Sequence, residues 1–367
     1  MAQSGLIENA TLEISCACRR ISGSVCVSSS ALPLPISLCH CDNCRYSTGL
    51  LCVSTVPLPK NSSSLQVRGK LKGYKSSTYK TRFFCEQCGA SIYDMTTNPD
   101  VASICTGILR RSDNIVELKR HKYVTDTKDE GLSVWLRDTA PGEDQPHKSG
   151  RTQHTSTALP VIPRTGSTES GPKLPGYCHC GGVQFQITRP DRHSTELSSP
   201  WPDLLVPYLS GSSENIGDVK WWLREDGTKY LAGTCACNSC RLASGYDIQV
   251  WAFVPKTNIL QANGQLLDFT MGTLRRFQSS EGIYREFCRS CGATVFWHCD
   301  ERPGLIDVSV GLLHAESGAR AESWLEWWTE RVSFEENAQN KALISRLGRG
   351  LKEWAMVKAK TPDTALS

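Results

Sequence analysis

The chain has 367 residues, of which 39% are hydrophobic and 21% charged, a composition typical of a globular protein long enough for two domains. Its formal net charge of +4 is too small to indicate the concentrated basic surface of a nucleic-acid binder. No apolar run approaches the roughly 18 residues that a membrane-spanning helix needs, so we expect no membrane partner.

The sequence begins MAQSGLIENATLEISC, without a basic stretch followed by an apolar one, which predicts no secretory signal. The chain nevertheless contains 18 cysteines. In a secreted protein they would indicate disulfides, and in an intracellular protein they indicate metal binding. We therefore expect zinc rather than disulfides, and a cytoplasmic location with the nucleus as the alternative.

Cysteines occur in the first half as C-A-C, C-H-C-D-N-C and C-E-Q-C, and in the second half as C-H-C, C-A-C-N-S-C and C-R-S-C. Fourteen of the 18 cysteines follow this rule, and neighbouring letters such as R-Y-S-T-G and R-L-A-S-G also recur. The repeat predicts two homologous domains, residues 12–138 and 174–335. The patterned residues are Cys16, Cys18, Cys39, Cys41, Cys44, Cys85 and Cys88, then Cys178, Cys180, Cys235, Cys237, Cys240, Cys288 and Cys291.

Between the cysteine groups, short β-branched or aromatic runs bounded by Gly and Pro predict strands. They lie at 49–58, 80–85, 90–95, 102–109, 246–254, 293–299 and 305–313. With so little helical pattern, the predicted fold class is mainly β, with each domain mostly antiparallel and stabilised by metal.

Three further segments are predicted outside this pattern. Residues 139–173 are rich in Pro, Ser, Thr and Gly, which is typical of a flexible linker. The second repeat has 54 residues between Cys180 and Cys235 where the first has 20 between Cys18 and Cys39, so it carries an insertion of 34, near 189–222. Its Trp and Leu residues indicate that it packs and could wall one side of the second site.

The C-terminal segment, 336–367, contains apolar residues at helical spacing with basic residues between them. They are Leu343, Leu347, Leu351 and Trp354. The spacing predicts a helix that docks its apolar face on the protein.

Seven patterned cysteines in each repeat divide into four and three. C-x-C and C-x-x-C together supply four thiolates, which close a tetrahedral structural zinc site. The remaining C-x-C-x-x-C supplies three, and catalytic zinc sites commonly keep three protein ligands and one open position. We interpret the triads Cys39/Cys41/Cys44 and Cys235/Cys237/Cys240 as such open sites, which predicts four zinc ions per chain.

The alternative is that another side chain completes each triad and makes it structural. Candidates are a histidine or one of the leftover cysteines, Cys26, Cys52, Cys105 and Cys299. These four cysteines have no counterparts in the other repeat and are expected to be ordinary buried thiols. His40 lies at the position of Ala236 in the second repeat, so we expect it to be exposed rather than a ligand, and His179 likewise matches Ala17.

The pattern C-x-C, C-H-C-x-x-C-R-x-x-x-G and F-C-x-x-C-G resembles the glutathione-dependent formaldehyde-activating enzyme family, which includes the centromere protein V-like proteins. The resemblance covers most of the chain, as two tandem copies. It implies an Mss4-like β fold with one structural and one catalytic zinc per domain. It also implies carbon–sulfur lyase activity, the addition of a glutathione-like thiol to a small aldehyde such as formaldehyde.

On this resemblance the structural ligands are Cys16, Cys18, Cys85 and Cys88, with Cys178, Cys180, Cys288 and Cys291 in the second copy. The catalytic ligands are Cys39, Cys41 and Cys44, with Cys235, Cys237 and Cys240. Arg45 and Arg241 follow the triads, and either attract an anionic substrate group or form ordinary salt bridges. Gly49, Gly245, Gly89 and Gly292 are expected in tight turns.

Two other functional hypotheses remain at this stage. One is a non-catalytic zinc module that binds a macromolecular partner, as the centromere protein V-like branch implies. The other combines one active domain with one scaffolding domain, and both triads are intact in the sequence. The chain contains no nucleophile elbow, phosphate loop or dinucleotide fingerprint, which argues against hydrolases and dehydrogenases.

Overall fold

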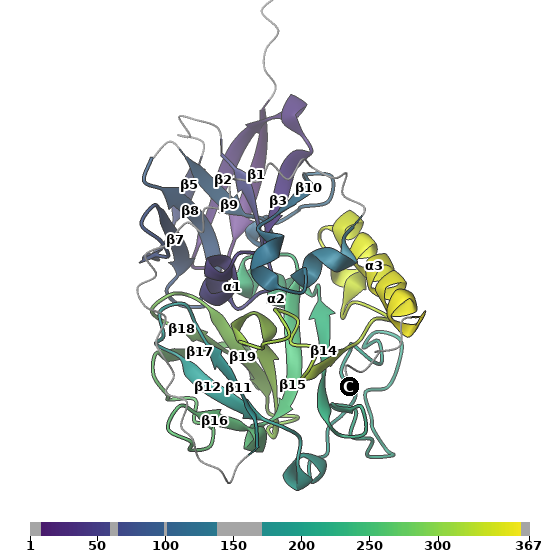
Figure 1. Cartoon of the computed structure of the whole chain (residues 1–367). Coiled ribbons are helices and arrows are strands. Elements are labelled where there is room, and N and C mark those ends of the chain that lie inside the picture. The colour runs from purple at the N-terminus through teal and green to yellow at the C-terminus, as the bar shows by residue number, and fades with distance from the viewer. Residues whose placement is uncertain (1–8, 59–64, 99–100, 138–170, 361–367) are drawn as a thin grey trace, which may run out of the picture.

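The structure is a computed structural model that describes residues 9–58, 65–98, 101–137 and 171–360. Figure 1 shows two β-rich halves, one coloured purple to blue and the other teal to green, with two short helices between them. A longer helix, in yellow, lies along one side. The predicted mainly β fold with two regions and a C-terminal helix is confirmed. Most of the predicted linker, 139–173, lies outside the described residues.

The first half comprises ten strands and one α-helix among the described residues. They are β1 (Asn9–Ser15), β2 (Ser22–Ser28), β3 (Leu34–Cys39), α1 (Asp42–Thr48), β4 (Val53–Pro57), β5 (Leu65–Arg68), β6 (Leu71–Lys75), β7 (Lys80–Cys85), β8 (Ser91–Thr96), β9 (Ala102–Cys105) and β10 (Val116–Lys122).

The second half follows the same order and adds β13 and the C-terminal helix. Its elements are β11 (Lys173–Tyr177), β12 (Gln184–Thr188), β13 (Leu223–Arg224), β14 (Lys229–Cys235), α2 (Asn238–Ser244), β15 (Gln249–Pro255), β16 (Ile259–Gln261), β17 (Leu274–Ser280), β18 (Ile283–Cys288), β19 (Thr294–Cys299), β20 (Leu305–Ser309), β21 (Leu325–Trp327) and α3 (Lys341–Lys360).

Each half contains a small sheet and a large sheet with equivalent strand orders. The small sheets are β1-β2-β5 and β11-β12-β16. The large sheets share the orders β3-β4-β9-β8-β7-β6 and β14-β15-β20-β19-β18-β17. Most pairings are antiparallel, but β10 pairs in parallel with β3, and β21 in parallel with β14. The sequence repeat therefore corresponds to a repeated topology.

The two halves contact each other through reciprocal backbone hydrogen bonds. Gly107 N–H donates to Gly245 O over 2.9 Å, and its counterpart Gly311 N–H donates to Gly49 O over 3.1 Å. Both acceptor glycines have left-handed backbone, with φ of 82° at Gly49 and 90° at Gly245. A Cβ at Gly49 would lie 2.1 Å from Thr294 O in the other half. These glycines therefore serve both the predicted tight turns and the close approach of the halves.

The insertion packs against the second half, as the sequence predicts. Its Trp221, Trp222 and Leu204 form a buried apolar cluster with Phe253 of β15. It also holds the segment after β21, because the Asp203 carboxylate accepts hydrogen bonds from Ser333 Oγ and from the Phe334 backbone N–H.

The C-terminal helix α3 buries the predicted apolar stripe, with Leu347 and Leu351 fully inaccessible. It packs on η4 (Gly131–Trp135), a 3-10 helix at the end of the first half, and the rings of Trp135 and Trp354 are 5.8 Å apart. The last element of the chain therefore contacts the end of the first half. Over the described part of the chain, no helix combines the length and apolarity that a membrane crossing requires.

Candidate metal centres

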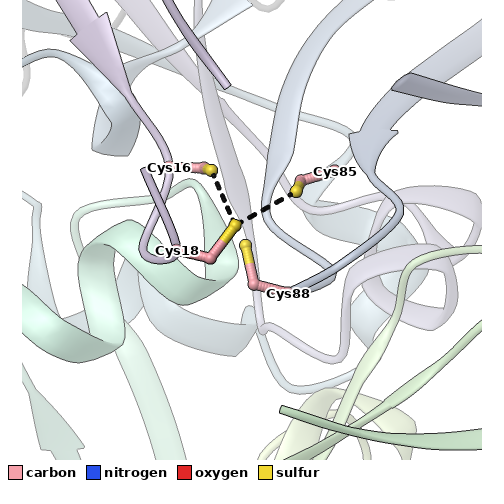
Figure 2. Close-up of side chains that lie close together, drawn as sticks. All are labelled: Cys16, Cys18, Cys85 and Cys88. Atoms are coloured by element: carbon pink, nitrogen blue, oxygen red, sulfur yellow. Dashed lines mark hydrogen bonds between the residues drawn. The ribbon is translucent and has the colours of Figure 1, made fainter. Parts of the chain in front are cut away.

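Four cysteine sulfurs lie close together at one point of the first half. Cys16 and Cys18 follow β1, Cys85 ends β7 and Cys88 lies in the turn that follows β7 (Figure 2). Cys18 Sγ lies 3.4 Å from Cys16 Sγ and 3.5 Å from Cys85 Sγ. The turn is closed by hydrogen bonds from Cys85 N–H to Ala90 O and from Gly89 N–H to Cys85 O. Residues far apart in the sequence are therefore joined at one point.

The second half repeats this cluster with Cys178, Cys180, Cys288 and Cys291. Cys180 Sγ lies 3.5 Å from both Cys178 Sγ and Cys288 Sγ. All ligand atoms in each cluster lie within 4.8 Å of one another. Tetrahedral zinc with Zn–S bonds of about 2.3 Å separates its sulfurs by roughly 3.8 Å. The four-sulfur donor set and its spacing therefore fit zinc.

The other two groups contain only three sulfurs each. Cys39 ends β3, Cys41 is the N-cap of α1 and Cys44 lies in its first turn, so one strand-to-helix connection brings them together. Cys39 Sγ lies 3.5 Å from Cys41 Sγ and 3.3 Å from Cys44 Sγ. The equivalent connection from β14 to α2 brings together Cys235, Cys237 and Cys240.

No fourth Cys, His, Asp or Glu joins either triad among the described residues. The leftover cysteines contact other groups or stand apart from the clusters. Cys105 Sγ lies 3.4 Å from the Tyr246 hydroxyl, and Cys26 Sγ lies 3.9 Å from Thr11 Oγ1. Cys52 and Cys299 are buried and belong to none of the four cysteine clusters. All 18 cysteines are free of disulfides.

A guanidinium group contacts one sulfur of each triad. Arg82 Nη2 lies 3.0 Å from Cys44 Sγ, and Arg285 Nη1 lies 3.5 Å from Cys240 Sγ. Both arginines are buried, on β7 and β18. Contacts with Cys39 and Cys41, together with the charge of Arg82, hold the pKa of the Cys44 thiol well below its ordinary value. The contact between Arg82 and Cys44 therefore favours the thiolate form of Cys44.

An aromatic residue follows the strand beside each triad. Tyr123 follows β10 and Phe334 follows the bridge at Ser333, and the two have left-handed backbone with φ of 56° and 53°. Bulky residues rarely adopt this conformation, and such strain concentrates at functional sites. Phe334 packs against Cys235 and Cys240. Tyr123 directly follows Lys122, which pairs with Cys39, and the nearby sulfurs add to burial in raising the pKa of the Tyr123 hydroxyl.

The expected exposure of His40 is wrong. Its side chain is fully buried, because His40 N–H binds Lys122 O of β10 and its ring bonds to His121 over 2.9 Å. Burial, followed by the neighbouring His121, lowers its pKa to about 3. His179 is half-buried at the contact between the halves, where it bonds to the Tyr74 hydroxyl and to Asn43 Oδ1.

The two arginines that directly follow the triads face the contact between the halves. Arg45 forms a 2.6 Å salt bridge with Asp42, so the structure shows the salt-bridge alternative. Arg241 donates to Gly107 O over 2.5 Å and to Leu109 O over 2.6 Å. The guanidinium groups of Arg45 and Arg241 therefore form structural contacts, whereas those of Arg82 and Arg285 contact the sulfurs of the triads.

Sequence reasoning did not assign Arg82, Arg285, Tyr123 or Phe334 to the sites. The two arginines had a signal, since both stand three residues before the first cysteine of the C-x-x-C pair in the recurring segments R-F-F-C and R-E-F-C. The two aromatic residues had none, because the letters around them, K-Y-V-T and S-F-E-E, share no pattern.

Two segments of the chain, residues 11–126 and 217–331, match the model of the family described as "Glutathione-dependent formaldehyde-activating enzyme", and together they exceed half of its length. The chain belongs to this family. The second match starts at residue 217, near the end of the insertion, and omits Cys178 and Cys180, yet the structure places these residues with Cys288 and Cys291.

One curated relative is an uncharacterized lyase of Schizosaccharomyces pombe, which is 37% identical over 65 residues. The aligned region covers 17% of this chain and 44% of that protein. The chain therefore spans less than half the length of this relative.

Proposed function

We propose that each half of this glutathione-dependent formaldehyde-activating enzyme family member is one domain, bounded by 12–138 and 174–335, and holds two zinc ions. The four-sulfur clusters are the structural sites. Each connects the start of its domain to a turn late in the same domain, and so closes a long loop of chain. The ligands are Cys16, Cys18, Cys85 and Cys88, and Cys178, Cys180, Cys288 and Cys291.

The three-sulfur groups are proposed as the catalytic sites, formed by Cys39, Cys41 and Cys44 and by Cys235, Cys237 and Cys240. Zinc bound there would supply an open coordination position at which a substrate thiol loses its proton at neutral pH. The chain's own contribution is the buried arginine, which balances the negative charge that accumulates on the sulfurs. The aromatic residue beside each triad limits the approach of water.

The proposed activity is that of a carbon–sulfur lyase acting on a glutathione-like thiol and a small aldehyde such as formaldehyde. The thiolate sulfur forms a bond to the carbonyl carbon, and the C=O π electrons move to the oxygen. That oxygen takes up one proton, so the thiol and the aldehyde combine without a leaving group. The reverse step breaks the same C–S bond and regenerates both reactants.

One observation carries the proposal: neither triad has a fourth protein ligand among the described residues, although both have a guanidinium at the third sulfur. A purely structural zinc site closes its tetrahedron with protein ligands. Membership of the family and the lyase name of the yeast relative support the same class of reaction.

Metal analysis of the purified chain tests the site assignment. We expect about four zinc ions per chain, two that a mild chelator removes and two that resist it, because the open sites have fewer thiolate ligands. Cys41→Ser and Cys237→Ser should each remove one weakly held ion, whereas Cys88→Ser should remove a tightly held one. Two ions in total would contradict the assignment.

Formaldehyde consumption with and without glutathione tests the reaction. We expect glutathione to accelerate consumption by the zinc-loaded protein, and Cys41→Ser and Cys237→Ser each to remove one site's share. Cys26→Ser is the matched control, because Cys26 is exposed and distant from the clusters. No acceleration, with four zinc ions bound, would favour a non-catalytic zinc module.

A further inference from the structure

Strand registers identify which residues of the two open sites are equivalent. Cys39 pairs with Val53 and Cys235 pairs with Gln249, so Thr55 of β4 and Trp251 of β15 occupy the same position two residues further along. Their side chains lie on the same sheet face as the cysteine that starts each triad.

A second pair of positions follows from the sulfur-bound arginines. Arg82 pairs with Asp94 of β8, and Arg285 pairs with Trp297 of β19. Lys80 and Ile283 stand two residues before these arginines, on the same face of their strands.

The third pair of positions is the aromatic one. Lys122 pairs with Cys39 and Ser333 pairs with Cys235, which makes Tyr123 and Phe334 equivalent. Four equivalent positions around the triads therefore change from polar in the first site to apolar in the second. They are Thr55 and Trp251, Lys80 and Ile283, Asp94 and Trp297, and Tyr123 and Phe334.

The first site presents charge beside its sulfurs. Lys80 Nζ lies 3.1 Å from Asp94 Oδ1, close to the Arg82 guanidinium. Lys122 is exposed and pairs with Cys39. Arg82 contacts Cys44 and Lys80 is paired with Asp94, so Lys122 adds a further positive charge beside this triad.

The second site presents aromatic surface in the corresponding places. Trp251, Trp297 and Phe334 pack with Cys235, Cys237 and Cys240 as one apolar cluster. A further cation, Arg302, lies over the Trp297 ring at 4.7 Å, and its charge is paired with the buried Asp307 at 2.8 Å. The charge that a substrate would meet here is therefore largely neutralised.

We infer that the two open sites accept thiols of opposite polarity: the first takes a thiol that carries a carboxylate, and the second takes one that carries an aromatic or other apolar group. This inference rests on the proposed function. Burying an apolar group against the aromatic side chains of the second site should improve its binding by roughly tenfold or more. A carboxylate bound at the same place would have no polar or charged partner, so its binding is disfavoured. The lysines of the first site reverse that preference.

Cobalt-loaded full-length protein provides a readout that does not depend on turnover, because a thiolate entering an open cobalt site changes its visible absorption. One open site is disabled at a time, with Cys41→Ser or Cys237→Ser. Each protein is titrated with phenylmethanethiol and with 3-mercaptopropionate, and the ratio of the two Kd values is compared between proteins. This comparison cancels the intrinsic difference between the thiols.

We expect the ratio to differ by at least about tenfold, with phenylmethanethiol favoured where the second triad is intact. Ile283→Lys, which copies Lys80 of the first site, should shift the ratio by roughly tenfold towards 3-mercaptopropionate. Lys80→Ile, which copies Ile283, should shift it the opposite way in the first site. Retention of the cobalt bands of the four-sulfur clusters shows that each variant is folded.

Equal ratios in the two proteins would overturn the difference in polarity while leaving thiol binding, and with it the proposed function, in place. If neither thiol changes the cobalt spectrum, both the difference in polarity and the proposed function would be overturned. Ratios that differ in the opposite sense would show that another part of the chain sets the preference, and would also overturn the inference.

Discussion

Two buried arginines lie beside the proposed open sites, although a guanidinium group does not bind metal itself. Arg82 and Arg285 are nearly inaccessible and contact the third sulfur of their triads. A cluster of thiolates concentrates negative charge, and a buried cation beside it stabilises the deprotonated form. Partners of this kind contribute to metal affinity although they are not ligands.

Replacing Arg82 by Met should weaken the first site. We expect zinc affinity at that triad, or its rate of thiol addition, to fall roughly 10- to 100-fold, because the Cys44 thiolate loses its cation. The measurement is zinc affinity by chelator competition, made in the Cys237→Ser background. Arg110→Met removes an equal charge at an exposed salt bridge with Glu13 and should leave the affinity unchanged. Equal effects of the two substitutions would contradict this role.

The clustered cysteines could be predicted from the sequence because their chemistry and short spacing are local properties. C-x-C and C-x-x-C place sulfurs within one turn, whatever surrounds them. The roles of Arg82 and Tyr123 depend instead on strand pairing, which brings β7 and β10 to the triad from elsewhere in the chain. The buried state of His40 depends on the same pairing with β10 and was predicted wrongly for that reason.

Among the elements, the C-terminal helix is held by its apolar face and by the N-cap Asn340, whose Oδ1 accepts from Leu343 N–H over 3.1 Å. Its polar face carries Met356, which is 63% exposed. Because α3 packs on η4, tertiary packing rather than intrinsic helix propensity provides most of the stability of α3.

Leu347→Ala should lower the free energy of unfolding by about 2–5 kcal/mol, since the side chain is fully buried and its loss leaves a cavity. Chemical denaturation of the zinc-loaded protein measures this change. Met356→Ala, on the exposed face of the same helix, should change stability by no more than about 0.5 kcal/mol. A small effect of Leu347→Ala would show that α3 unfolds separately from the rest.

The insertion reaches the second open site through Asp203, whose carboxylate also accepts from Arg331 Nη2 over 3.1 Å. Asp203→Ala should loosen the segment that carries Phe334 and weaken thiol binding by roughly tenfold at the second site alone, through loss of these bonds. Cobalt absorption in the Cys41→Ser background measures the change. Glu214→Ala, an exposed change in the same insertion, is the control. A matching loss at the first site would indicate general unfolding instead.

At this scale, seven strand segments were predicted from β-branched and aromatic runs, and the C-terminal helix was predicted from the helical spacing of its apolar residues. The seven-residue helices α1 and α2 did not, because they are too short to show a periodic face. The parallel pairings of β10 with β3 and of β21 with β14 were not predicted either, because the pattern of residues within a strand does not show which strands are its neighbours.

Across the whole molecule, one apolar core continues from the first half into the second and includes α3. At the contact between the halves, the His314 ring stacks on Tyr177 with centroids 3.4 Å apart and on Tyr46 at 4.1 Å. Burial lowers the pKa of His314 to about 3, so the ring is neutral at pH 7.

This histidine makes the stability of the contact depend on pH. Its folded pKa lies below the ordinary value of 6.5, so the unfolded chain binds more protons as pH falls through 6.5, and stability is lost on the acidic side. Between pH 7 and 5 the wild type should lose about 2 kcal/mol more than His314→Phe, which keeps a stacking ring. Denaturant unfolding at both pH values, with zinc present, measures it. Identical losses would contradict a neutral buried His314.

The repeat in the sequence indicated two related halves but not how they meet. Gly107 and Arg241, which join them, stand in segments that recur in the two halves, but recurrence alone does not distinguish a contact from a turn. Their positions became apparent only as reciprocal hydrogen bonds in the structure.

The reciprocal contact has the form of a two-fold subunit interface, but a single polypeptide supplies both sides. In an assembly of identical subunits, every substitution appears twice, so both reaction centres must change together. Here a mutation alters one triad and leaves the other unchanged. Dilution cannot separate the two halves either, so one triad can diverge while the other keeps its residues and the halves stay joined.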